Sequence, residues 1–127
     1  MTPNAISAHI VDAALQTHRS LGPGLLESVY QAVLAAELRD RGLQVVEQQC
    51  IPVIYKGQNL GTAFRADLMV QNLVIVENKS VEAIAPVHRM QLLTHLRLAN
   101  YQLGLLVNFN VARIKDGITR VVNGLQE

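Results

Sequence analysis

Apolar positions in the first third of the chain recur at helical spacing, which predicts a helix over residues 4–20. The segment LGPG at 21–24 ends this helix, and Pro23 suits the first turn of a second one. The second helix is predicted to run to about Arg41 and to stop at Gly42, a typical C-terminal residue. The chain therefore begins with two predicted helices.

From Leu43 the hydrophobic pattern changes to a period of two, which is typical of β-strands. Turns are indicated at Lys56–Gly57 and at Gln71–Asn72, so strands are predicted on either side of each turn. Pro52 lies within the first run, and because proline cannot donate to a strand ladder, it favours an edge strand.

The last third of the chain predicts a helix and then strands. The helical pattern extends from about Pro86 to Asn100, and the apolar run QLGLLVNFN at 102–110 is typical of a strand buried on both faces. A last hairpin or edge strand is expected around Asp116–Gly117. Helices segregated around a mixed sheet predict an α/β or α+β fold.

Composition favours one domain covering residues 1–127, because half of the residues are apolar and a chain of this length can bury a core. Cys50 is the single cysteine, so it forms no disulfide within the chain, and we expect it in the core. The chain has no apolar run of the roughly 20 residues that cross a membrane, and its N-terminus does not resemble a signal peptide. We therefore expect a cytoplasmic protein without a membrane partner.

The charge balance and the aromatic content of the chain disfavour two kinds of nucleic-acid-binding protein. The chain has 11 basic and 10 acidic residues, a net charge of +1, which is not typical of a protein that coats nucleic acid. Aromatic residues make up 4% of the sequence, which argues against a stacking platform for single strands. A local basic cleft remains compatible with this balance.

The segment FRADLMVQNLVIVENKS, residues 64–80, carries Asp67, Glu77 and Lys79 inside apolar runs. Buried charges are costly unless they are paired or bound to a cation. Glu77 and Lys79 are two positions apart on one predicted strand, so they point to the same face. The three side chains are therefore the first candidates for a functional site.

The length of the connecting turn decides whether Asp67 joins the other two. A two-residue turn at Gln71–Asn72 places Asp67 opposite Val76, on the wrong face, whereas a three-residue turn or a bulge places it opposite Glu77. We predict the longer turn or a bulge, because one cation could then satisfy both carboxylates.

Two carboxylates on one face suit a hard cation such as Mg²⁺ or Mn²⁺. Such an ion polarises a phosphoryl oxygen and lowers the pKa of bound water, and Lys79 would orient that water or stabilise negative charge. The alternative is a salt-bridge cluster in which Asp67, Glu77 and Lys79 only tie two strands together.

The residues around these positions resemble known families. Asp67 with Glu77-Asn78-Lys79 resembles the PD-(D/E)xK nuclease core, and LGPGLLESVYQAVLAAEL looks like the signature of the GxxExxY family. In that signature the matching residues are Gly24, Glu27 and Tyr30, and RADLMV, IVENKSV and QLLTHLRL are similar to the family as well. The resemblance implies the PD-(D/E)xK restriction-endonuclease-like fold, a central mixed sheet flanked by helices.

The resemblance also implies roles for individual residues. Asp67 and Glu77 match the metal carboxylates, and Lys79 matches the catalytic lysine. Glu27 matches a helical glutamate that many relatives place beside the metal, and Gln91 matches a glutamine that faces the active site. The implied activity is Mg²⁺-dependent hydrolysis of phosphodiester bonds in DNA or RNA.

Four further residues bear on the details of the implied site. Asn78 replaces a usually apolar residue and must find hydrogen bonds on the other face of the sheet, and His95 replaces a common tyrosine. His95 and Arg65 are expected to meet substrate phosphates, and Tyr30 is expected either to be a buried ring or to contribute to substrate binding.

The sequence therefore favours a metal-dependent nuclease. The alternative is a nucleic-acid-binding or accessory protein that keeps the fold and does not cut, and a third option is a purely structural interaction domain. Because the net charge is near zero, we expect specificity to come from a partner or from a homodimer.

Overall fold

The computed structural model describes residues 1–126. Two helices, α1 (Pro3–Leu21) and α2 (Glu27–Asp40), precede the strands β1 (Val45–Tyr55), β2 (Gln58–Val70) and β3 (Val74–Lys79). Helix α3 (Pro86–Ala99) follows, then β4 (Leu103–Asn108), the short 3₁₀ helix η1 (Ile114–Gly117) and β5 (Ile118–Val122). Within these residues no helix is both long and apolar enough to cross a membrane.

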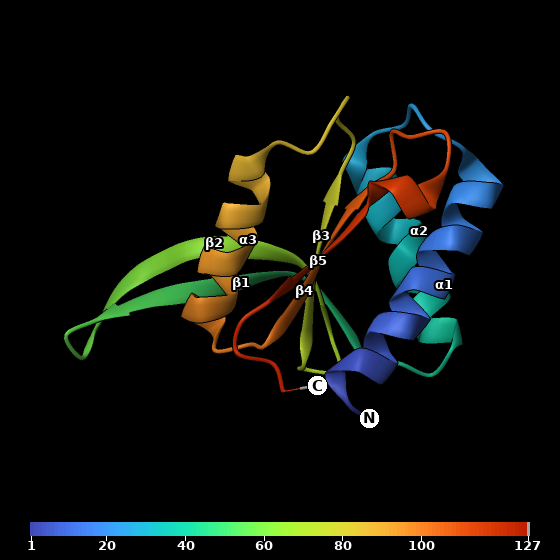
Figure 1. Cartoon of the computed structure of the whole chain (residues 1–127). Helices are drawn as coiled ribbons and strands as arrows, with labels where there is room; N and C mark the ends of the chain where they lie inside the picture. Colours follow the sequence, from blue (N-terminus) through green and yellow to red (C-terminus); the bar gives the residue numbers. More distant parts are fainter. Residues whose placement is uncertain (127) are drawn as a thin grey trace.

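The strands form one mixed sheet in the order β1-β2-β3-β4-β5. Strands β3 and β4 are parallel and joined by α3, and the other neighbouring pairs are antiparallel. Helices α1 and α2 cover one face of the sheet, and α3 covers the other (Figure 1). The fold is therefore α+β and consistent with a PD-(D/E)xK-like architecture, as the sequence predicts, and β1 with Pro52 is an edge strand.

The core consists of two layers that meet at the central strands. Every residue of β4 is buried, because α1 and α2 pack on one side of it and α3 on the other, which confirms the strand expected from its continuous apolar run. The layer beneath α1 and α2 contains Ile6, Ile10, Leu34, Leu68 and Val76. The layer beneath α3 contains Ile75, Leu92, Leu96 and Leu106.

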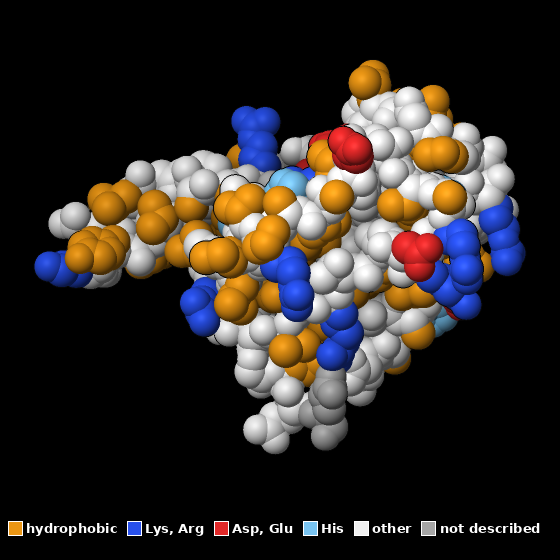
Figure 2. Space-filling view, turned by 45° about the horizontal axis from the view of Figure 1, so that its top comes forward, with side chains coloured by type: hydrophobic (Ala, Val, Ile, Leu, Met, Phe, Trp, Pro, Cys, Tyr) orange, Lys and Arg blue, Asp and Glu red, His pale blue; other side chains and the backbone are white. Residues whose placement is uncertain are grey.

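The outer parts of β1 and β2 form a two-stranded ribbon that projects from the body of the molecule (Figure 1). Hydrophobic side chains are visible along it (Figure 2), and Ile54, Tyr55 and Leu60 are more than half exposed. Cys50 is exposed at the start of this ribbon, so its expected place in the core is wrong. Alternating apolar residues predicted strands here, but they did not show that the strands leave the core.

Two local predictions also differ from the structure. Pro23 lies in the loop before α2 and not in its first turn, because the helix begins at Glu27. Asp116 and Gly117 belong to η1 and not to a hairpin turn, but the expected edge strand is formed, because β5 follows directly at the edge of the sheet. Glycine is required there, since a Cβ atom on Gly117 would lie 2.2 Å from the carbonyl oxygen of Asn108.

Candidate active site

The connection between β2 and β3 has three residues. Val70 pairs with Val74, and the N–H of Leu73 donates to the carbonyl oxygen of Val70 at 3.0 Å. Gln71 and Asn72 adopt the left-handed conformation that such a turn uses, with φ of 54° and 53°. The predicted three-residue turn is therefore confirmed.

The register of this hairpin brings the two strand carboxylates opposite one another. Leu68 pairs with Val76, so one step further Asp67 lies across from Glu77. Regular pairing of β2 with β3 stops at that point, and the sheet opens. The end of β3 therefore has backbone donors that no strand satisfies.

Two carboxylates take the place of the missing strand. The N–H of Asn78 donates to Oδ2 of Asp67 at 2.9 Å, and the N–H of Ser80 donates to Oε1 of Glu27 at 3.1 Å. The hydroxyl of Ser80 also donates to the carbonyl of Leu25 at 2.9 Å. The first residue of α2 is thereby fixed to the end of β3, and Glu27 and Asp67 lie beside the same short segment.

Asp67 is further held by a chain of amides. Nε2 of Gln48 donates to Oδ1 of Asp67 at 3.2 Å and to Oε1 of Gln31 in α2 at 2.6 Å. Gln48 reaches both acceptors from a left-handed backbone conformation, with φ of 51°. Gln48 could not be predicted from the sequence, because an exposed glutamine in a strand gives no signal of such a role.

The pKa of Asp67 is raised, and burial is the main cause. The hydrogen bonds from Asn78 and Gln48 act in the opposite direction, as does the charge of Lys79. The negative charge of Glu77 adds to the increase, so the two carboxylates repel one another across the opening. Perturbed carboxyl groups of this kind are typical of functional sites.

Glu77 is 6% exposed and faces α3, where it contacts Nδ1 of His95. The ring of His95 stacks on Phe64 with centroids 3.8 Å apart. A partner for Glu77 is physically necessary, because a buried carboxylate without one is costly. His95 was expected to meet a phosphate, but its Nδ1 is used by Glu77, and Phe64 was not identified from the sequence.

Lys79 is partly buried at the end of β3 and forms no ion pair with any residue from 1 to 126. The salt-bridge cluster considered as an alternative is therefore not formed. Gln91 is exposed on α3, one turn before His95. His95 contacts Glu77, and α3 runs antiparallel to β3. One helical turn back from His95, about 5.4 Å, corresponds to about two residues forward along the strand, so Gln91 lies at the height of Lys79.

Tyr30 and Arg65 are the two other residues that the sequence suggested as substrate contacts. Tyr30 is fully buried, and its hydroxyl donates to the carbonyl of Gly22 at 2.5 Å and accepts from the N–H of Leu25 at 3.1 Å. These contacts favour the buried-ring alternative for Tyr30, whose hydroxyl holds the loop before Glu27. Arg65 is exposed on β2, as a phosphate contact requires.

Asn78 also differs from expectation. It is 1% exposed, and neither its side-chain oxygen nor its side-chain nitrogen has a hydrogen-bond partner within the described part of the chain. The expected hydrogen bonds on the other face of the sheet are therefore not made. We have no physical account of this buried amide.

The carboxylates fit a hard divalent ion in their chemistry but are not gathered into a finished site. Residues 1–126 contain no group of three or more His, Cys, Asp or Glu side chains placed to hold a metal. The expected ligand set of Asp67, Glu77 and Glu27 is thus not assembled, because each carboxylate has a different partner. Two repelling carboxylates on adjoining strands are nevertheless a donor set that a cation stabilises.

Comparison with known proteins gives one match. A family model described as the PD-(D/E)XK nuclease superfamily matches residues 4–121, a range that includes every candidate residue named above. No curated protein and no solved structure gives a significant match.

Proposed function

Since the chain belongs to the PD-(D/E)XK nuclease superfamily, we propose that it is a metal-dependent nuclease that hydrolyses phosphodiester bonds in nucleic acid. Enzymes of this superfamily generally use divalent metal ions. The observation that carries the proposal is the opening between β2 and β3, where Asp67, Glu77, Glu27 and Lys79 surround the end of one strand. We also propose that the chain is a GxxExxY protein, and the contacts of the signature residues Glu27 and Tyr30 with the loop and strand end at this opening support that proposal.

Asp67 and Glu77 would hold Mg²⁺ or Mn²⁺, with Glu27 contributing directly or through a water molecule. When bound, such an ion polarises a phosphoryl oxygen and lowers the pKa of water. Lys79 forms no ion pair within residues 1–126, although its charge lowers the pKa of Asp67, so its ammonium group would be available to donate to the attacking water or to the developing negative charge. Gln91 lies on α3 at the height of Lys79, and it would orient substrate or water from the side of this helix.

His95 has a separate task in this scheme. It holds Glu77 in place by contact with Nδ1, and Phe64 fixes the plane of its ring. The carboxylate of Glu77 is therefore kept oriented at the opening. We propose that Arg65, exposed on the ribbon near Asp67, contacts a substrate phosphate.

Cleavage assays test this proposal. Duplex DNA, single-stranded DNA and RNA are incubated with the protein in Mg²⁺, in Mn²⁺ and in EDTA, beside the variants Asp67→Asn and Lys79→Gln. We expect metal-dependent cleavage by the parent and a loss of about 10²–10³-fold in each variant, the effect of removing one group that stabilises the transition state. Asp40→Asn, at the exposed end of α2, is the matched control and should cleave at the parent rate.

A nucleic-acid-binding protein that does not cut is the second candidate, and the contact with His95 that already occupies Glu77 favours it. Calorimetric titration of Mg²⁺ and Mn²⁺ distinguishes the two. The nuclease proposal expects binding that disappears in the double variant Asp67→Ala/Glu77→Ala. Nucleic-acid binding without metal binding and without cleavage would favour the second candidate, and sedimentation would show whether the binding form is a homodimer.

A further inference from the structure

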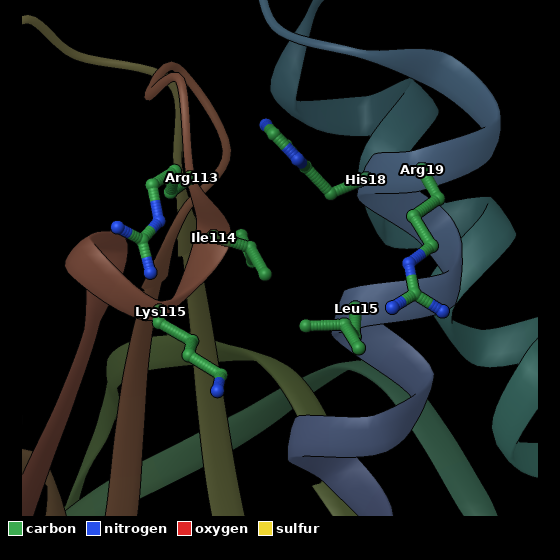
Figure 3. Close-up of a pocket in the computed structure, with 6 residues that line it drawn as sticks. All are labelled: Leu15, His18, Arg19, Arg113, Ile114 and Lys115. Atoms are coloured by element: carbon green, nitrogen blue, oxygen red, sulfur yellow. The ribbon is translucent and has the colours of Figure 1, made fainter.

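A cavity of about 210 Å³ lies between the C-terminal half of α1 and the 3₁₀ helix η1 (Figure 3). It is lined by Leu15, His18, Arg19, Arg113, Ile114 and Lys115. None of the residues proposed for cleavage lines it. Four of the six lining side chains are basic or can become cationic, and none is acidic, so the cavity needs an explanation of its own.

Apolar contact and one hydrogen bond build this cavity. Leu15 and Ile114 point toward one another across it (Figure 3), and Ile114 is 4% exposed because it packs into the core beneath α1. Nε2 of His18 lies 2.8 Å from the carbonyl oxygen of Val111 and must carry the hydrogen, since a carbonyl only accepts. This bond ties the segment before η1 to the last turn of α1, so the cavity walls are fixed relative to one another.

The positive charges around the cavity are not neutralised within residues 1–126. Arg19, Arg113 and Lys115 form no ion pair there. The acidic residues nearest in sequence do not change this, because Asp12 pairs with Arg41 at 3.8 Å and Asp116 does not line the cavity. The carbonyl end of α1 offsets part of the charge of Arg19.

We propose that this cavity binds a phosphate group. A concave surface lined by one sign of charge concentrates the electrostatic potential and attracts an ion of opposite sign. Guanidinium groups present paired donors that match phosphate oxygens, and Lys115, which extends from η1 toward α1 in Figure 3, adds a further charge.

The phosphate can belong to a nucleic-acid backbone or to a small phosphorylated compound. The backbone is geometrically accessible, because β3 and β4 are parallel and Lys79 pairs with Asn108, a short loop before Arg113. The cavity and the candidate active site therefore lie toward the same end of the sheet (Figure 1). A nucleic acid at the active site could place a phosphate several nucleotides away in this cavity.

Binding measurements in EDTA test the inference without any cleavage. Inorganic phosphate and pyrophosphate are titrated calorimetrically, and a labelled duplex and a labelled single strand are titrated by fluorescence anisotropy. The variant Arg113→Gln/Lys115→Gln is compared with Arg89→Gln/Arg97→Gln, which removes the same charge from exposed positions of α3. Arg19→Gln serves as an independent second variant on the other wall, and thermal unfolding verifies that all variants are folded.

We expect the cavity variants to weaken binding by about tenfold or more and the α3 variant by less than about twofold, because charge-assisted hydrogen bonds are the stronger kind. Loss of pyrophosphate binding identifies a small phosphorylated compound as the source. Loss of oligonucleotide binding, with a salt dependence reduced by about one unit per phosphate contact, identifies the backbone. Failure of the parent to bind any of these ligands, or equal weakening in both double variants, overturns the inference.

The outcome is independent of cleavage. A protein that binds phosphate here but never cuts nucleic acid refutes the nuclease proposal and leaves this site intact. A protein that cuts with Mg²⁺ but shows no dependence on Arg113 and Lys115 refutes this site and leaves the nuclease proposal intact.

Discussion

Tyr30→Phe separates the two roles that the sequence left open for this residue, and it changes a single oxygen atom. The hydroxyl bridges the carbonyl of Gly22 at 2.5 Å and the N–H of Leu25 at 3.1 Å. Both groups belong to the loop before α2, and the carbonyl of Leu25 also accepts the hydroxyl of Ser80. The substitution therefore removes the centre of the network that places Glu27 beside β3.

The expected loss follows from these two hydrogen bonds. Each contributes about 0.5–1.5 kcal/mol net, so the variant should lose about 1–3 kcal/mol of unfolding free energy. The ring itself keeps its place, because its stacking on Phe109 at 4.5 Å does not involve the hydroxyl. For a chain of this length, a loss of about 2 kcal/mol lowers the melting temperature by roughly 6–10 °C.

Urea unfolding followed by circular dichroism measures this loss directly. Tyr55→Phe is the matched control, because Tyr55 is 58% exposed on the ribbon, and it should change stability by less than about 0.5 kcal/mol. Unchanged stability of Tyr30→Phe together with weakened nucleic-acid binding would refute the reasoning. That result would mean that the hydroxyl contacts substrate, which a fully buried side chain cannot do without a change of structure.

Three other substitutions give independent tests. Because burial raises the pKa of Asp67, its stabilising contribution is present below the unfolded value of 3.8 and is lost as pH rises through the native value. The stability of Asp67→Asn relative to the parent should therefore improve from about pH 4 to about pH 7 in urea titrations, and a constant difference would contradict this. His95→Phe should cost about 2 kcal/mol, since it keeps the ring stack but leaves buried Glu77 unpaired, and adding Glu77→Gln should recover at least part of the loss in a double-mutant cycle. Gly117→Ala should cost about 2 kcal/mol or more, because the new Cβ atom meets the carbonyl of Asn108 at 2.2 Å, and an unchanged melting temperature would disprove the required glycine.

The parity of strands explains why much of this site was predictable. Side chains alternate with a period of two, so the demand that Asp67 and Glu77 share a face selected a three-residue turn from the sequence alone. The same periodicities placed α3 and β4 within one or two residues of their observed ends. The local hydrophobic pattern was therefore sufficient to predict those helices and strands whose buried faces decide their structure.

Interactions between distant segments were not predictable in this way. The loop at 22–26 ends where the Tyr30 hydroxyl and the Ser80 side chain hold it, and α2 therefore starts later than Pro23 indicated. The contact of Glu77 with His95 depends on the height at which α3 crosses β3, which no single segment encodes. Cys50 was misplaced for a related reason, because alternation predicts strands but not whether a helix covers them.

The acidic side chains at the opening have structural partners that need not be given up when a metal binds. Asp67 accepts the backbone N–H of Asn78 in β3, Glu27 accepts that of Ser80 just after it, and the two carboxylates thereby replace the strand that is missing there. A carboxylate offers about four lone-pair positions on its two oxygens, so each can keep its backbone bond and still coordinate an ion. Glu77 is different, because the group that holds it is the side chain of His95. Under the proposed metal-dependent function, a two-carboxylate site therefore requires one exchange of partners, in which the ion replaces His95 at Glu77. We expect the strength of the Glu77–His95 contact to determine how readily the opening takes up the ion.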